Sequence, residues 1–381
     1  MKKVYGLLSV FFLLLFLESM FPSDNRADVS NSAEAGKQDN DSIEKKVVNT
    51  DSLLIFPAVY YTPETKIAGG ILGGYYFYPS QNPDFSKPSF ITLELLYTEL
   101  EQIKGEVTCD IFWGEYKNRF TGAVGYSRFP SKFWGIGNDT ASDDEKVYTP
   151  EGFWLNLDYK NLVAGGVFLG LDYEYIRRDI VREAQGSGIE WESVTGKDGG
   201  AISRFGLSVT SDSRNHLIYP SSGGYYQAQV RFATRAIGPE FDFTSMNMDL
   251  RRYGTLFDSI VVATQLNGVF NIGDTPFFNA ASIGGKYLMR GFYEGRYRDD
   301  NMLALQTECR LPLWWRFGIV AFAGFAQVAD RIEDFRLDNF KFAFGGGLRF
   351  LWDKEQKLNI RLDVGFAEGK PALYVTIGEA F

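Results

Sequence analysis

The sequence predicts an all-β protein, a transmembrane antiparallel β-barrel of about sixteen strands. Segments in which apolar and polar residues alternate recur along the chain. Aromatic residues make up 16% of a chain whose mean hydropathy is only -0.16, a composition typical of a wall with one apolar face and one wet face. After the N-terminal region, no apolar run is long enough for a membrane-spanning helix.

The N-terminus has the pattern of a secretory signal peptide. Two lysines precede an apolar run from Val4 to Leu17. This order of charged and apolar residues is typical of an export signal, and the run is too short for a comfortable transmembrane helix. We therefore expect a signal peptide over residues 1–22, with cleavage between residues 18 and 28.

A polar segment separates the signal from the first expected strand. Residues 23–52 are mainly Asp, Asn, Ser, Lys and Glu, with few large apolar side chains. Such a segment buries too little surface to offset the entropy lost on ordering, so we expect a disordered periplasmic tail. The barrel itself is expected over residues 53–381.

The strands are predicted from their period of two. Between residues 357 and 366, every second residue is Leu, Ile, Val or Phe, and the residues between them are Asn, Arg, Asp and Gly. Read in this way, the chain gives an even number of segments, long enough to cross a bilayer at a tilt. The expected strands are 53–61, 67–78, 89–99, 103–114, 116–127, 151–160, 164–180, 200–212, 224–235, 243–254, 257–270, 300–311, 316–329, 340–352, 356–366 and 371–381.

The connections and the polar faces indicate how the barrel is oriented. Long polar connections at 128–150, 181–199 and 271–299 alternate with tight turns, and long loops are expected outside the cell with short turns on the periplasmic side. The polar faces carry charges of both signs, such as Arg361 and Asp363. We therefore expect a wet lumen.

Charge and reactive residues exclude several classes of function. The net charge of -9 argues against a nucleic-acid partner. His216 is the only histidine, and Cys109 and Cys309 lie far apart without metal-ligand spacing, so we expect free thiols, no metal, no cofactor and no enzymatic activity. The acidic segment 138–148 lacks the spacing of a calcium-binding EF-hand, and 282–287 lacks that of a phosphate-binding loop.

The segment 277–313 carries a recognisable motif. Its core is an Arg-Gly-aromatic signature with its neighbours, followed by a glutamate on the next expected strand: Met289, Arg290, Gly291, Phe292 and Glu308. This motif resembles the barrel of the BamA and TamA superfamily, the bacterial surface-antigen proteins. The resemblance implies that the loop between strands 11 and 12 folds into the barrel and that its arginine pairs with an acidic inner-wall residue. An arginine in a partly desolvated lumen needs such a carboxylate.

Three further segments resemble the same family. They are the start of the barrel at 53–70, the periplasmic turn within 208–226, and the C-terminal residues from Tyr374 to Phe381, which look like the aromatic signal that the barrel assembly machinery reads. Within the first strand, Pro57 cannot donate to a ladder. The proline at this position therefore predicts weak hydrogen bonding between the first and last strands, where the barrel closes.

The sequence departs from the family in two respects. BamA-like assembly factors carry periplasmic POTRA domains before the barrel, whereas here only the short polar tail precedes it. The family often has an aspartate on the thirteenth strand, where this chain has Gly324. That difference leaves Glu308 as the main expected partner of Arg290.

The resemblance implies an integral outer-membrane barrel of a Gram-negative bacterium that assists insertion, assembly or translocation of proteins or lipids. Two alternatives stay open: a passive or gated pore plugged by the 271–299 loop, and a structural accessory subunit of another outer-membrane complex. The expected partners are outer-membrane lipid and lipopolysaccharide, the barrel assembly machinery during biogenesis, and a protein partner that the sequence does not identify.

Overall fold

The computed structural model describes residues 51–79, 89–182, 191–257, 259–354 and 357–381. The expected signal peptide and the expected tail up to Thr50 lie outside the described residues.

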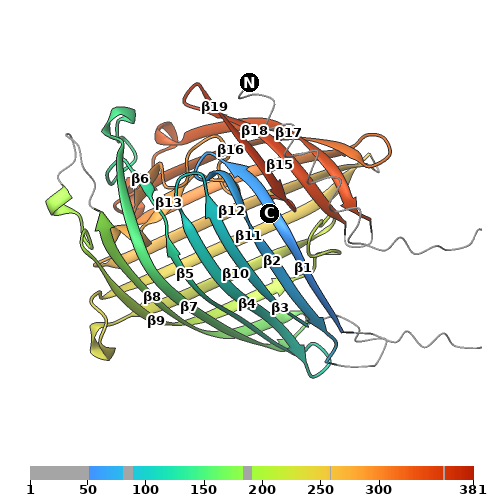
Figure 1. Ribbon diagram of the computed structural model, residues 1–381, viewed down its shortest axis with the longest axis horizontal. Coiled ribbons are helices and arrows are strands. Elements are labelled where there is room, and N and C mark those ends of the chain that lie inside the picture. The colour runs from blue at the N-terminus through green and yellow to red at the C-terminus, as the bar shows by residue number, and fades with distance from the viewer. Residues whose placement is uncertain (1–50, 80–88, 183–190, 258, 355–356) are drawn as a thin grey trace, which may run out of the picture. The chain divides into compact units, whose positions relative to one another are not determined.

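The described chain forms a closed antiparallel barrel of sixteen strands (Figure 1). This confirms the predicted fold class. The barrel strands are β1 (Ser52–Thr62), β2 (Lys66–Phe77), β3 (Ser89–Thr98), β4 (Ile103–Trp113), β5 (Asn118–Arg128), β7 (Lys146–Ala164), β8 (Val167–Arg182), β9 (Gly199–Asp212), β10 (Gly223–Ala233), β11 (Phe243–Leu256), β12 (Ile260–Gly273), β15 (Asn301–Pro312), β16 (Phe317–Ala329), β17 (Lys341–Asp353), β18 (Leu358–Ala367) and β19 (Lys370–Ile377).

The described parts of the connections add three short strands and six single-turn 3₁₀ helices. The strands are β6 (Ser131–Phe133), β13 (Ala281–Ile283) and β14 (Tyr297–Asp299). The 3₁₀ helices are η2 (Ser142–Asp144), η3 (Trp191–Ser193), η4 (Arg235–Ile237), η5 (Phe277–Asn279), η6 (Ile332–Asp334) and η7 (Leu337–Asn339). Within the described ranges, no helix combines the length and the hydropathy needed to cross a membrane.

The burial pattern shows which face of the wall meets lipid. On β18, the polar residues Asn359, Arg361 and Asp363 are buried, whereas Leu362 and Phe366 are 38% and 39% exposed. A soluble β-sandwich has the opposite distribution, because its apolar face is buried and its charged face meets water. The alternation therefore belongs to a barrel with an apolar outer surface and a polar interior.

Successive strands of the barrel are antiparallel, so the connections alternate between its two ends. Counted by position in the barrel and not by label, the connections after the first, third, fifth and every later odd strand lie at one end; β12, for example, is the eleventh strand. The three longest connections, 129–145 between β5 and β7, 183–198 between β8 and β9, and 274–300 between β12 and β15, are of this kind, and we name this the loop end. The opposite end, which holds tight turns such as 165–166 between β7 and β8, is named the turn end.

Two strands differ from the predicted bounds by four residues or more at one end or both, and the others differ by three or fewer. β7 begins at Lys146 rather than near residue 151, because its first residues pair with β6 beyond the barrel wall. The last strand was expected over 371–381, but β19 ends at Ile377. Gly378 follows with a φ of 82°, a left-handed conformation that glycine adopts without strain, and the chain leaves the sheet there.

Candidate functional site

The loop between β12 and β15 folds into the barrel lumen. β13 and β14 pair with each other, and the segment between them reaches the inner wall. Met289, Arg290 and Phe292 are between 1% and 3% exposed, so the motif is buried within the barrel. The backbone N–H of Met289 donates a hydrogen bond to Oε1 of Gln306 on β15 at 3.3 Å.

Arg290 makes two ion pairs with carboxylates of the inner wall, one on β15 and one on β18. Its Nη2 lies 3.0 Å from Oε2 of Glu308 on β15, and its Nη1 lies 2.5 Å from Oδ2 of Asp363 on β18. Its guanidinium also lies over the ring of Phe322, 3.7 Å from the ring centroid. Both carboxylates are fully buried, which makes these charge-assisted contacts strong in a region of low dielectric.

Gly291 occupies a position that no larger residue fits. Its φ is 121°, and a Cβ atom built on it would lie 2.9 Å from the carbonyl carbon of Phe366 and 3.1 Å from Cβ of Ala367. The loop backbone therefore lies directly against β18. This close approach is what brings Arg290 within reach of Asp363 on the same strand.

The two carboxylates belong to a larger buried charge cluster. Three further arginines and one further carboxylate on the inner wall complete it: Arg310, Arg349, Arg361 and Glu379. Glu308 contacts Arg310 at 3.3 Å and Arg349 at 3.6 Å. The cluster thus holds four guanidinium groups, from residues 290, 310, 349 and 361, and three side-chain carboxylates, from residues 308, 363 and 379. We name these seven residues the charge cluster.

The sequence did not single out Asp363 as a partner of Arg290. The alternation along β18 placed Asp363 on the polar face, but the contact itself requires the loop to cross the lumen. At Gly324 on β16, a Cβ atom would lie 2.8 Å from Sδ of Met289, and Arg290 takes its second carboxylate from Asp363 on β18 instead. The side chain of Met289 occupies the space that a larger residue at 324 would require.

We name the connection 274–300, between β12 and β15, the inner loop. It contacts both sides of the seam, where β1 meets β19 and the barrel closes. The hydroxyl of Tyr374 on β19 accepts a hydrogen bond from Gly291 N–H at 3.1 Å and donates one to the Phe292 carbonyl at 3.3 Å. On the other side, Glu294 N–H donates to Oε1 of Glu64, in the turn between β1 and β2, at 3.0 Å. The loop therefore bridges the first hairpin and the last strand near the loop end.

The seam between β1 and β19 is held by very little pairing. Among the residues that the structure describes, Tyr61 and Val375 are the only pair across it, whereas β18 and β19 pair along the whole of β19, from Lys370 to Ile377. Tyr61 is near the loop end of β1, so the seam is joined there. From Tyr60 back to Ser52, the edge of β1 that faces away from β2 has no described strand beside it.

The residues after β19 turn into the lumen instead of extending the seam. Phe381 is 6% exposed, and its main-chain oxygen accepts a hydrogen bond from Nη2 of Arg310 at 2.8 Å. Glu379 pairs with Nε of Arg349 at 2.8 Å. Continued in the register of Tyr61 and Val375, the last strand would place Glu379 opposite Pro57 on β1. The diversion of this segment leaves Pro57 on the unpaired part of the seam.

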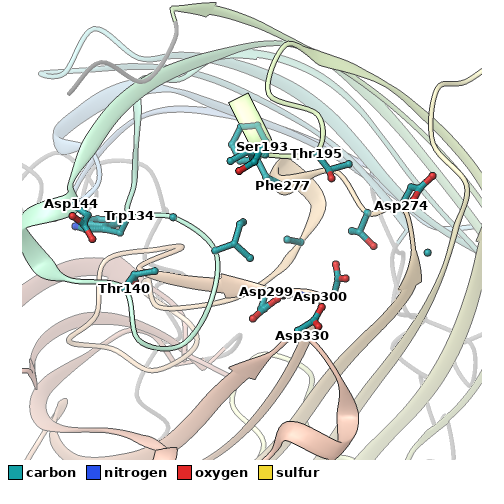
Figure 2. A pocket seen from close by; sticks show the side chains of 16 residues that line it. Trp134, Thr140, Asp144, Ser193, Thr195, Asp274, Phe277, Asp299, Asp300 and Asp330 are labelled. Carbon is teal, nitrogen blue, oxygen red and sulfur yellow. Dashed lines mark hydrogen bonds between the residues drawn. The ribbon is translucent and has the colours of Figure 1, made fainter. Parts of the chain in front are cut away.

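A cavity of about 530 Å³ lies among the connections at the loop end. Figure 2 shows Asp299, Asp300 and Asp330 close together on its wall, with Asp274 and Thr195 nearby. Burial, together with the neighbouring carboxylates, raises the pKa of Asp299 to about 6. Across the residues that the structure describes, no His, Cys, Asp or Glu side chains form a group of three or more that could hold a metal ion.

Among the solved structures that resemble this barrel are those of two bacterial proteins. One is BamA from Haemophilus ducreyi lacking POTRA domains 1–3, with a TM-score of 0.58 and 14% identity, covering 87% of this chain and 70% of that one. The other is CdiB from Acinetobacter baumannii, with a TM-score of 0.53 and 11% identity, covering 86% of this chain and 59% of that one. At these identities the likeness shows the fold alone, and the chain spans less than two thirds of CdiB.

A family model of the Omp85 superfamily domain matches residues 131–381. No curated protein sequence matches the chain. The described residues contain the barrel and its connections, without a POTRA region. The family match extends over well more than half of the sequence and includes the inner loop, the charge cluster and the last strand. The chain therefore belongs to the Omp85 superfamily of outer-membrane β-barrel proteins.

Proposed function

We propose that this barrel assists the insertion or assembly of other proteins at the outer membrane by offering the edge of β1 to an incoming strand. The observation that carries the proposal is the seam, where Tyr61 and Val375 are the only paired residues in the described part of the chain. An unpaired strand edge in hydrocarbon leaves its N–H and C=O groups without partners, which costs several kcal/mol per group. A strand from another chain would satisfy these groups.

The position of the opening also supports the proposal. The seam is joined near the loop end and lacks pairing toward the turn end, where we expect the periplasm. A strand that arrives from the periplasm would therefore meet the free part of β1 first. The contacts of the inner loop with Tyr374 and Glu64 hold the closed part in register while the rest stays accessible.

A disulfide across the seam tests this function. Val59 and Ile377 would lie opposite each other if pairing continued past Tyr61 and Val375, and both side chains are partly exposed, at 38% and 42%. In a chain whose Cys109 and Cys309 are replaced by alanine, Val59→Cys with Ile377→Cys should cross-link under oxidation. We expect the oxidised barrel to lose its effect on outer-membrane protein levels and the reduced barrel to regain it.

The matched control places the second cysteine on a strand already paired with β19. Ile360 lies opposite Ile377, so Ile360→Cys with Ile377→Cys forms a disulfide without closing the seam. The readout is the set of outer-membrane protein levels in the native host, compared with a strain that lacks the gene. If the seam cross-link leaves these levels and growth the same as the control cross-link does, the proposal is wrong.

A gated pore is the second candidate, and the polar lumen favours it. On the wall opposite the charge cluster, Arg231 pairs with Asp172 at 2.6 Å, and Arg204 pairs with Glu174. Such an interior accommodates water and ions, and the inner loop would act as the plug. Deletion of residues 286–298 should then raise conductance in planar bilayers, and an unaltered conductance would exclude the plug.

A further inference from the structure

The outer wall of the barrel holds a shallow apolar groove over β5, β7, β8, β9 and β10. Its volume is about 430 Å³. Aromatic rings and leucines line it, from Phe120 on β5 to Phe232 on β10. The lining side chains are open to the membrane: Leu171, Phe205 and Leu207 are 60%, 56% and 54% exposed.

Strand pairing arranges the lining in two neighbouring rows across the sheet. In one row, Leu171 lies opposite Tyr159 on one side and Leu207 on the other. In the next row, Tyr173 lies opposite Leu157 and Phe205, and the rings of Tyr173 and Phe205 are 4.8 Å apart. Side chains in such rows are near neighbours on one face of a sheet, so they form a continuous apolar surface.

The groove extends from one end of the barrel toward the other. Phe120 lies two residues from the start of β5 at the turn end, and Phe232 lies one residue from the end of β10 at the loop end. The rows cross strands that are themselves tilted in the membrane. The groove therefore runs obliquely across the membrane-facing wall, which suits an extended, flexible chain better than a compact ligand.

The polar atoms along the groove already have partners within the barrel. The hydroxyl of Tyr159 donates to Oδ1 of Asn118 at 2.7 Å, and the hydroxyl of Tyr173 accepts a hydrogen bond from Ser203 at 3.1 Å. Asp172, whose backbone also borders the groove, directs its carboxylate to Arg231. What the groove offers to a ligand is hydrocarbon contact.

The turn end of the groove offers features that fit a lipid headgroup. Trp113 is 42% exposed and stacks on Tyr159, with ring centroids 5.8 Å apart, and tryptophan favours the headgroup layer. Lys117 follows in the next turn, with its side chain 60% exposed and only the equally exposed carboxylate of Glu115 at 3.4 Å. An exposed pair of this kind is weak, so an anionic phosphate can compete for the ammonium group.

We propose that this groove is a binding site for one acyl chain of an anionic phospholipid, whose phosphate lies at the turn end beside Lys117. The occupant is a lipid because the groove is continuous with the surface that the barrel presents to the membrane. Selectivity over bulk lipid comes from dispersion contacts with the rings and from the lysine, since transfer between two hydrocarbon surroundings gives no hydrophobic gain. This site is separate from the seam on β1 and β19.

Photolabelling of the full chain in vesicles tests the site. The probe is phosphatidylglycerol with a diazirine in its acyl chain, present as a minor component of phosphatidylethanolamine vesicles, and labelled peptides are mapped by mass spectrometry. We expect peptides from β7, β8 and β9 to be labelled about tenfold more than those from β3, which corresponds to about 1.4 kcal/mol. Equal labelling of the peptides from β7, β8 and β9 and of those from β3 would overturn the proposal.

Filling the groove provides the matched comparison. Leu171→Trp and, independently, Leu207→Trp place a large ring in the groove and should remove the excess labelling. Leu95→Trp makes the same change at a membrane-facing position of β3 that is 46% exposed and should leave the labelling as in the unmodified chain. Labelling is compared only between barrels that migrate as folded species in unheated gels, so that every variant in the comparison is folded.

The source of the lipid is tested with two further probes. Lys117→Gln should lower labelling by phosphatidylglycerol and leave labelling by a zwitterionic phosphatidylcholine probe unchanged. Lipid A with a diazirine acyl chain should label the groove no more than it labels β3. Excess labelling that survives both tryptophan variants, or that lipid A produces as strongly as phosphatidylglycerol, would show that the groove is not a phospholipid site.

Discussion

Replacing Glu308 with glutamine tests whether the charge cluster holds the inner loop in place. Glutamine keeps the size of the side chain and removes its charge. Glu308 is 0% exposed and lies within 3.0 to 3.6 Å of guanidinium nitrogens from Arg290, Arg310 and Arg349. The variant therefore leaves three buried arginines with one carboxylate fewer. The charge cluster changes from four positive and three negative side chains to four positive and two negative ones.

The size of the effect follows from these distances. At 3.0 Å and an effective dielectric constant of about 20, one such pair attracts by roughly 5 kcal/mol, and desolvation of both charges offsets part of this. Breaking a buried pair by removing one partner costs about 3–5 kcal/mol, because the remaining charge is buried without compensation. We expect a loss of this order in the free energy of unfolding for Glu308→Gln.

Urea unfolding in detergent micelles measures the loss, with tryptophan fluorescence and gel migration of unheated samples as two readouts. Glu115→Gln is the matched control, because Glu115 pairs with Lys117 at a site where both side chains are 60% exposed and should change stability by less than about 1 kcal/mol. If Glu308→Gln unfolds at the same urea concentration as Glu115→Gln, the charge cluster does not stabilise the barrel.

Three further substitutions test neighbouring features. Gly291→Ala forces a Cβ against Phe366 at a φ of 121°, so the inner loop should leave the wall. Trypsin should then cleave it at Arg290 or Arg296, and a loop that stays resistant to trypsin contradicts this prediction. Tyr374→Phe removes a hydroxyl that bonds Gly291 and Phe292, costing about 1 kcal/mol and speeding hydrogen exchange at Gly291. The pKa of Asp299 is raised from 3.8 to about 6, so its contribution to stability is present below pH 3.8 and lost as the pH rises through 6. Asp299→Asn should remove that decline in thermal unfolding scans, and an equally steep decline would exclude Asp299 as its source.

The strand pattern was predictable because it is local. Alternation on β18 gave both the strand and the inward face of Asp363, since side chains two residues apart share one side of a sheet. The predicted inward position of Glu308 follows from the same rule. The contact of Asp363 with Arg290 was not predictable, because it depends on how the strands are staggered around the closed barrel and on how deep the loop lies.

The residue at which the last strand ends also could not be predicted from the local sequence pattern. The strand was expected to extend to Phe381 because a C-terminal aromatic residue resembles the end of a last strand, although Glu379 falls on the same face as Val375 and Ile377 and interrupts the alternation. In the structure, Arg349 and Arg310 attract Glu379 and the main-chain oxygen of Phe381 into the lumen. Ion pairs between distant strands decide the path of this segment, and a single sequence does not reveal them.

The pairing of Arg290 with Asp363 also sets an order of events during biogenesis. The two residues are 73 positions apart in the chain, and β15, β16 and β17 lie between them. The loop therefore cannot dock until the C-terminal strands have been synthesised, exported and placed in the wall. A chain that stops before β18 leaves the arginine without its second carboxylate, so docking of the loop marks a barrel whose last strands are in place and separates finished molecules from incomplete ones.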